Sequence, residues 1–193
     1  IIVSDPHSGF ILGLSNYPTI DPNHYSKYEV SSHRNRALTD PLEPGSTFKI
    51  VAASSALEEG LVSIHDEFDC SISTLRMPTG YVARLPNDWK PFGVLSVEGI
   101  VTNSSNRGAA HLGTLVGYEE FYDYVRRFGF GERTGLNLGV ESRGIVHPVN
   151  KCDGLTLLRM TMGHSLSATP LQIHNGMATI ANGGLFMLSH IVS

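Results

Sequence analysis

The stretch that decides the fold is EPGSTFK, residues 43–49, which leads directly into the apolar run IVAASSAL of residues 50–57. Alanine, leucine, valine and isoleucine occupy nearly every side of the helix expected from residue 46 to residue 59, a pattern typical of a buried helix. Gly60 is suited to end this helix, because glycine readily adopts the left-handed conformation that follows many helices. A serine and a lysine, three residues apart, therefore lie at the start of a buried helix.

This serine and lysine, Ser46 and Lys49, allow two interpretations. A serine hydroxyl is a weak nucleophile until a base takes its proton. Residues at i and i+3 share one helix face, and a desolvated lysine has a lowered pKa and can serve as that base. Alternatively, Ser46 or Thr47 caps the helix and Lys49 extends into solvent. Lys49 is the only charged residue of this helix before Glu58, and that isolation favours the chemical interpretation.

A second polar cluster, NSSN at residues 103–106, follows a short apolar helix for which Ser96 is the expected N-cap. Ser104 and Asn106 place a hydroxyl and a carboxamide on one side of a turn. The hydroxyl could pass a proton to a leaving amine, and the amide could bind a peptide group of a substrate. The alternative is a polar turn whose side chains satisfy their own backbone.

The remaining segments predict an α+β fold in which an antiparallel sheet is flanked by helical clusters. Strands are expected in a hairpin over residues 1–14, as short pieces within 61–95 and 134–146, and from residue 185 to the end. Further helices are expected over residues 107–117, 118–131 and 170–182. The last of these has Thr169 as its cap, Pro170 in its first turn and Gly183 as its stop. Phe121, Tyr124, Val125 and Phe128 recur at helical spacing and are expected in the core. Residues 15–45 are predicted to form an irregular segment at the surface.

Composition excludes several functional classes. The chain has 193 residues, 41% of them hydrophobic, which is sufficient for one sizeable core. The net charge of -4 and the scattered basic residues argue against nucleic acid as a partner. No apolar run reaches the ~18 residues of a membrane span. The nine histidines lack metal-binding spacing, so we expect no metal and no cofactor. Cys70 and Cys152 form either a disulfide or two buried thiols, and the length of the chain favours thiols.

The order S-x-x-K followed by S-x-N resembles the superfamily of penicillin-binding proteins and serine β-lactamases. The flanking sequences are similar to the transpeptidase domain of class B penicillin-binding proteins: PGSTFK, SSN followed by RGAA, RFGFGERTG (127–135), GHSLSATPLQ (163–172) and ATIANGG (178–184). Residues 2–23 resemble the opening strands of that domain. The resemblance is collinear and runs from Ile1 to the end of the chain, so a single transpeptidase domain over residues 1–193 is implied.

The resemblance implies a role for each polar residue singled out above. Ser46 corresponds to the acyl-accepting nucleophile, and its backbone N–H to half of the oxyanion hole. Lys49 corresponds to the base, Ser104 to the proton shuttle and Asn106 to the amide that binds the substrate backbone. The implied activity is D,D-transpeptidation of peptidoglycan stem peptides through an acyl-serine intermediate, with β-lactam antibiotics acylating the same serine. The implied location is the outer face of the bacterial cytoplasmic membrane, with an anchor outside this chain and with partner proteins of cell-wall synthesis.

One departure from the family pattern is the third motif, Lys-Thr/Ser-Gly. None of Lys27, Lys49, Lys90 and Lys151 is followed by Thr-Gly or Ser-Gly, and His7-Ser8-Gly9 falls in the first hairpin, where the family has an ordinary turn. We therefore expect a partial domain, incomplete at its C-terminus, with weak or no turnover by itself. The alternative function is a non-catalytic β-lactam sensor or scaffold; a serine β-lactamase, which needs a deacylating carboxylate, is a third. His164 is expected at the rim of the site.

Overall fold

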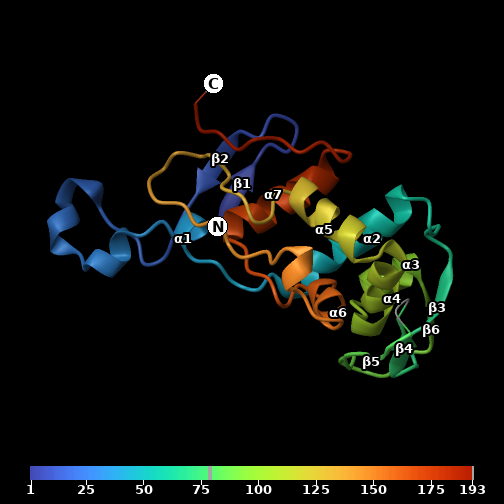
Figure 1. Cartoon of the computed structure of the whole chain (residues 1–193). Coiled ribbons are helices and arrows are strands. Elements are labelled where there is room, and N and C mark those ends of the chain that lie inside the picture. Colours follow the sequence, from blue (N-terminus) through green and yellow to red (C-terminus); the bar gives the residue numbers. More distant parts are fainter. Residues whose placement is uncertain (78–79, 193) are drawn as a thin grey trace. The chain divides into compact units, whose positions relative to one another are not determined.

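The computed structural model describes residues 1–77 and 80–192, and the chain divides into two compact units (Figure 1). The first contains residues 1–42, 126–145 and the described residues from 167 onward; the second contains the described residues of 43–125 and 146–166. Helices and antiparallel strand pairs occur together, so the predicted α+β class is confirmed. The strands of the described residues form three two-stranded ladders.

The first unit is built on a hairpin and one long helix. Strands β1 (Ile2–Ser4) and β2 (Ile11–Leu14) pair antiparallel, as the sequence predicts. Helix α7 (Pro170–Ala181) contacts both β1 and the short helix α1 (Arg36–Thr39). The 3₁₀ helices η1 (Pro22–Lys27) and η2 (Val30–His33) lie in the stretch predicted to be irregular. The buried core of this unit comprises Ile11, Leu38, Leu136 and Leu171.

Helix α7 begins where local sequence chemistry predicts. Thr169 Oγ accepts a hydrogen bond from the backbone N–H of Gln172, and Gln172 Oε1 accepts one from the N–H of Thr169. This reciprocal capping box satisfies two donors that the helix itself leaves free. Gly183, with φ +66°, follows the helix as predicted. The buried Gln172 also donates through Nε2 to the carbonyls of Glu132 and Arg143, so it connects α7 to the segment 132–143.

The predicted strand over residues 185–193 is wrong for its described part. Residues 185–192 make one isolated parallel bridge, in which His190 pairs with Phe10 beside the first hairpin. The N–H of Ile11 donates to His190 O, and the N–H of His190 donates to Gly9 O. The blue hairpin and the red C-terminal segment run side by side in Figure 1. Both bonds lie around one residue, and a buried hydrogen bond from Ser189 Oγ to Asn175 Oδ1, at 2.9 Å, also holds the segment.

The second unit is mainly helical. Helix α2 (Lys49–Glu58) packs against α4 (Asn106–Val116), which also contacts α3 (Val97–Thr102) and α6 (Thr156–Met160). Small residues allow the close approach: a Cβ at Gly108 would lie 2.4 Å from Ile100, and one at Gly113 would lie 2.1 Å from Thr161. Helix α5 (Tyr118–Arg127) buries Phe121, Tyr124 and Val125 of the predicted stripe, and its last two residues belong to the first unit. Phe128, the fourth residue of the stripe, follows the helix and is also buried. Helix α6 is not among the helices predicted from the sequence.

Short strands complete the second unit, and all but the last residue of β6 fall within the predicted range 61–95. Strand β3 (Glu67–Asp69) pairs with β6 (Val94–Ser96), and β4 (Thr74–Arg76) pairs with β5 (Val82–Arg84), all antiparallel. A 3₁₀ turn, η4 (Val149–Lys151), precedes α6. The predicted strand within residues 134–146 reduces to one bridge between Ile145 and Ser167, in the first unit. Within residues 1–77 and 80–192, no helix is both long and apolar enough to cross a bilayer.

Candidate active site

The segment EPGSTFK forms a tight turn and the start of a helix. Residues Gly45–Phe48 make a 3₁₀ turn, η3, and α2 continues from Lys49. The backbone N–H of Lys49 donates to Ser46 O, so the chain closes from i to i+3. Side chains at i and i+3 eclipse each other in a 3₁₀ turn, which places Lys49 directly over Ser46. The side chain of Phe48 is buried in edge contact with Phe121 and anchors the turn, whereas Ser46 is exposed.

The loop after α6 holds this turn from outside. The N–H of Gly45 donates to Gly163 O over 3.1 Å, and a Cβ on Gly163 would lie only 2.2 Å from Gly45 O. Glu43 accepts hydrogen bonds from the ring of His164, at 2.8 Å, and from the N–H of Ser165, at 3.1 Å. The bond from His164, then that from Ser165, lowers the pKa of Glu43. His164, expected at the rim, thus fixes the approach to Ser46.

Lys49 is buried, with 3% of its surface exposed. Its Nζ donates to Ser104 Oγ at 2.9 Å and to the Ser104 carbonyl at 2.5 Å. Burial lowers the pKa of Lys49, and the negative charge of Asp88 opposes this shift. The interpretation in which Lys49 extends to solvent is wrong, and neither Ser46 nor Thr47 caps the helix. A lysine held in this way can lose its proton more readily than one in water.

Ser104 has an unusual backbone conformation, with φ +56°. The N–H of Ser104 donates to Val101 O and the N–H of Ser105 donates to Ile100 O, which together end α3 in a Schellman motif. Glycine is the usual residue at this left-handed position, since it has no Cβ to crowd the backbone. The motif directs both the hydroxyl and the carbonyl of Ser104 to Lys49 Nζ. The strained backbone therefore belongs to a residue of the candidate active site.

Asn106 is the first residue of α4, and its amide is already oriented. Its Nδ2 donates to Asn87 O at 2.7 Å, which leaves Oδ1 free of any hydrogen bond from the described residues. The backbone N–H of Asn106 donates to Asp88 Oδ1. Because the NH₂ group of this amide is held by Asn87, its oxygen is left to accept a hydrogen bond. A backbone N–H of a bound peptide can supply that bond.

Asp88 is the residue that sequence reasoning missed. Its carboxylate accepts hydrogen bonds from Ser105 Oγ and from the N–H groups of Asn106 and Arg107 at the start of α4. A carboxylate is stabilised at a helix N-terminus, where the unpaired N–H groups point outward. The same charge acts on Lys49. The only signal in the sequence is an aspartate in a polar loop, 18 residues before the helix that it caps.

The structure brings two of the four predicted site residues, Lys49 and Ser104, into direct contact, and the other two, Ser46 and Asn106, lie within three residues of them in the chain. Lys49 contacts Ser104, and Ser46 lies one 3₁₀ turn before Lys49. Among the described residues no hydrogen bond reaches Ser46 Oγ, so the hydroxyl is open to a substrate. Asn106 is two residues after Ser104, held by the loop that contains Asp88. Serine, lysine and a second hydroxyl in this order can transfer an acyl group, with the buried amine accepting the proton of the nucleophile.

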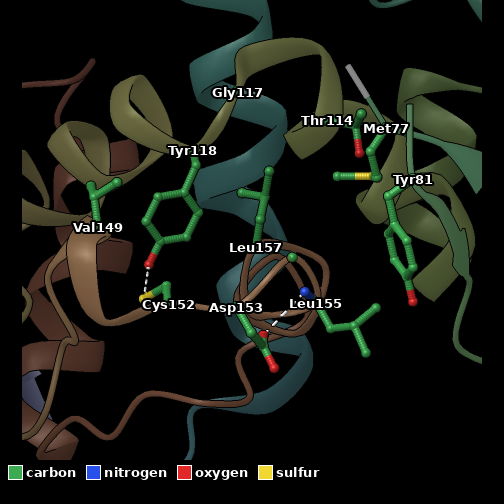
Figure 2. A pocket seen from close by; sticks show the side chains of 11 residues that line it. Met77, Tyr81, Thr114, Gly117, Tyr118, Val149, Cys152, Asp153, Leu155 and Leu157 are labelled. Carbon is green, nitrogen blue, oxygen red and sulfur yellow. Dashed lines mark hydrogen bonds between the residues drawn. The ribbon is translucent and has the colours of Figure 1, made fainter. Parts of the chain in front are cut away.

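An apolar cavity of about 600 Å³ lies in the second unit, apart from these residues (Figure 2). Its walls include Leu157, Tyr118 and Cys152, and the Tyr118 hydroxyl donates to Cys152 Sγ at 2.5 Å. Burial and this thiol raise the pKa of Tyr118. Cys152 and Cys70 are both free thiols, of which Cys70 is fully buried, so the disulfide alternative is wrong. None of the four predicted site residues lines this cavity.

Comparison with known proteins identifies the family. The family model described as the penicillin binding protein transpeptidase domain matches residues 1–193. This chain belongs to that family. Penicillin-binding protein PbpB of Mycobacterium tuberculosis is 36% identical over 99% of this chain and 28% of its own length. Peptidoglycan D,D-transpeptidase FtsI of Escherichia coli is 28% identical over 96% of this chain and 30% of its own length.

Solved structures of penicillin-binding transpeptidases agree with the fold. Penicillin binding protein 3 of Mycobacterium tuberculosis, complexed with aztreonam, has a TM-score of 0.87 and 34% identity, over 99% of this chain and 42% of that one. The apo transpeptidase domain of Burkholderia pseudomallei penicillin-binding protein 3 has a TM-score of 0.83 and 26% identity, over 100% of this chain and 52% of that one. The chain thus spans less than a third of these two curated relatives and about half of the structures.

Proposed function

We propose that the protein is a serine D,D-transpeptidase that cross-links peptidoglycan stem peptides through an acyl-enzyme on Ser46. The observation that carries the proposal is the buried Lys49, whose Nζ donates to Ser104 Oγ and which lies one turn from Ser46. The relatives named peptidoglycan D,D-transpeptidase support the same reaction. Residues 1–193 are proposed to form part of one transpeptidase domain, as the extent of the family match suggests.

The proposed reaction starts with the transfer of the Ser46 proton to neutral Lys49. Ser46 Oγ forms a bond to the carbonyl carbon of the penultimate D-alanine, while the backbone N–H of Ser46 stabilises the negative charge on the carbonyl oxygen. The C–N bond to the terminal D-alanine then breaks. The proton passes from Lys49 through Ser104 Oγ to the leaving amine. Asn106 Oδ1 accepts a hydrogen bond from the peptide backbone and positions the scissile bond.

The second half of the reaction resolves the acyl-enzyme. An amine of a neighbouring stem peptide forms a bond to the acyl carbon and gives up a proton to Ser104 and Lys49. The ester C–O bond to Ser46 then breaks, and Ser46 Oγ takes up that proton. β-Lactams are proposed to acylate Ser46 by the same route, and the related structure with aztreonam supports this class of ligand. We further propose action at the outer face of the cytoplasmic membrane, together with other proteins of cell-wall synthesis.

Intact-mass measurement tests the nucleophile. The complete gene product is incubated with benzylpenicillin, and the adduct is located by peptide mapping. We expect one equivalent of adduct on residue 46, its loss in Ser46→Ala, and its retention in the control Ser54→Ala, which changes a serine further along α2. An adduct that persists in Ser46→Ala would contradict the assignment.

Two further measurements separate the remaining alternatives. Release of D-alanine from a stem pentapeptide supports the transpeptidase, whereas acylation by penicillin without any release favours the non-catalytic sensor. For the 193-residue chain alone we propose slow acylation, because its sequence has no Lys-Thr/Ser-Gly, and the loss of one oxyanion donor costs ~100- to 1000-fold. Rapid stoichiometric acylation of that chain would contradict this proposal.

A further inference from the structure

A second cavity, of about 320 Å³, adjoins the loop that orients Asn106. Its floor is apolar: Leu85 and Leu158 are 3% and 2% exposed, and Leu155 and Met162 complete it. Arg84, at the end of β5, and Arg159, on α6, are both exposed and line the same cavity. An apolar floor with a few polar groups at its edge is the usual composition of a ligand pocket.

The two arginines at this cavity are not used by the fold. Among the described residues, no hydrogen bond or ion pair engages the guanidinium of Arg84 or of Arg159. The charge of Arg159 acts on the carboxylate of Asp153, whose pKa is lowered mainly by its bond from Thr156 and less by Arg159. The cavity lining contains no acidic residue. Two unpaired guanidinium groups at one pocket favour an anionic ligand group, and their planar donor pairs match a carboxylate.

Hydrogen bonds from α4 hold the loop that lines this cavity. Asn87, which lines the cavity, accepts the hydrogen bond from Asn106 Nδ2 through its carbonyl. From the other side, Arg107 donates to Pro86 O at 3.2 Å and to Asn87 Oδ1 at 3.5 Å, and also to Ser71 O at 2.7 Å. The lining of the cavity and the group that orients the Asn106 amide thus belong to one loop.

We propose that this cavity is a subsite for a stem-peptide side chain with an aliphatic body and a terminal carboxylate, which Arg84 and Arg159 bind. The inference rests on the proposed function, since it takes the peptide bound at Asn106 as its ligand. The aliphatic part covers Leu85 and Leu158, and the carboxylate replaces the water around the two guanidinium groups. The carboxylate can come from the third residue of the stem peptide or from the α-carboxyl group of its second residue.

Calorimetric titration of the complete gene product carrying Ser46→Ala, which prevents turnover, tests the subsite. Three pentapeptides are compared: one with diaminopimelate at position three, one with lysine there, and one with diaminopimelate but with the glutamate α-carboxyl group as an amide. We expect removal of the bound carboxylate to weaken binding about ten-fold or more. The lysine peptide reports on the third residue and the amidated peptide on the second.

Variants then assign the effect to the arginines. Arg84→Gln with Arg159→Gln should abolish the difference between the peptides, whereas Arg76→Gln, an exposed arginine on β4 outside the cavity, should retain it. Equal affinity for all three peptides, no measurable binding, or an unchanged difference in the double variant would overturn the proposal. Release of D-alanine by the unmutated protein is measured separately. If release is absent while the difference persists, the proposed function fails and the subsite stands.

Discussion

Replacing Gly163 by alanine would test whether the loop after α6 holds the turn that presents Ser46. The added Cβ would lie 2.2 Å from Gly45 O and 2.6 Å from Gly45 N, closer than the 3.0 Å that real Cβ atoms keep. Both neighbours are backbone atoms, so the contact must open by roughly 0.8 Å to reach that limit. Because a displacement of ~1 Å at a reacting group costs about 100-fold in rate, we expect acylation of Ser46 to fall by roughly that factor.

Gly60→Ala is the matched control for Gly163→Ala. Gly60 has φ +63° and Gly163 has φ +77°, so alanine suffers a left-handed penalty of ~1–2 kcal/mol at both positions. A Cβ on Gly60, however, would meet no atom within 4 Å. We therefore expect Gly60→Ala to lower the free energy of unfolding by about that penalty while the acylation rate stays unchanged.

The assay is the second-order rate of acylation of the complete gene product by benzylpenicillin, followed by intact mass. Urea unfolding of both variants reports the free energy of unfolding. We expect only Gly163→Ala to acylate slowly while it is still folded. A rate for Gly163→Ala within about two-fold of that for Gly60→Ala would refute the idea that this contact positions Ser46.

Three further predictions address charge, backbone strain and burial. Asp88→Asn removes the charge that opposes the lowering of the Lys49 pKa, so the acid limb of the pH–rate profile for acylation should move to lower pH; an unmoved limb contradicts this coupling. Ser104→Ala and Ser104→Gly should both acylate slowly, but the glycine variant should be more stable to urea by ~1 kcal/mol, because φ is +56° at this residue. Burial lowers the pKa of His111, and its Nε2 has no hydrogen-bond partner among the described residues. Below the ordinary histidine pKa of about 6.5, the unfolded chain therefore binds more protons than the folded chain. The free energy of unfolding should drop as the pH falls through this range. Urea unfolding at several pH values should show a smaller drop for His111→Phe.

Features governed by local chemistry could be predicted from the sequence. The stop of α2 at Gly60, the cap of α3 at Ser96 and the start of α7 at Thr169 each depend on residues within one turn. Ser46, Lys49 and Ser104 were predicted from their spacing and their resemblance to a family. The contact of Lys49 with Ser104 spans 55 residues, so no local rule predicts it.

Features governed by tertiary packing could not be predicted in this way. Helix α6 has five residues and is stabilised by contact with α4 rather than by a cap of its own. The role of Asp88 depends on a loop that carries its carboxylate back to the start of α4. The segment after Gly184 has the apolar composition of a strand, yet its described part finds only one bridge partner. In each case the decisive neighbour is far away in the sequence.

Ser104 has a consequence for attempts to engineer this protein. Its backbone adopts a conformation that favours glycine, so a procedure that selects residues by backbone preference would replace it. The replacement would improve the end of α3 and remove the hydroxyl that contacts Lys49. A stabilised design could then express and fold better while losing the chemistry. Screens for thermal stability should therefore be paired with a penicillin-labelling step at every round.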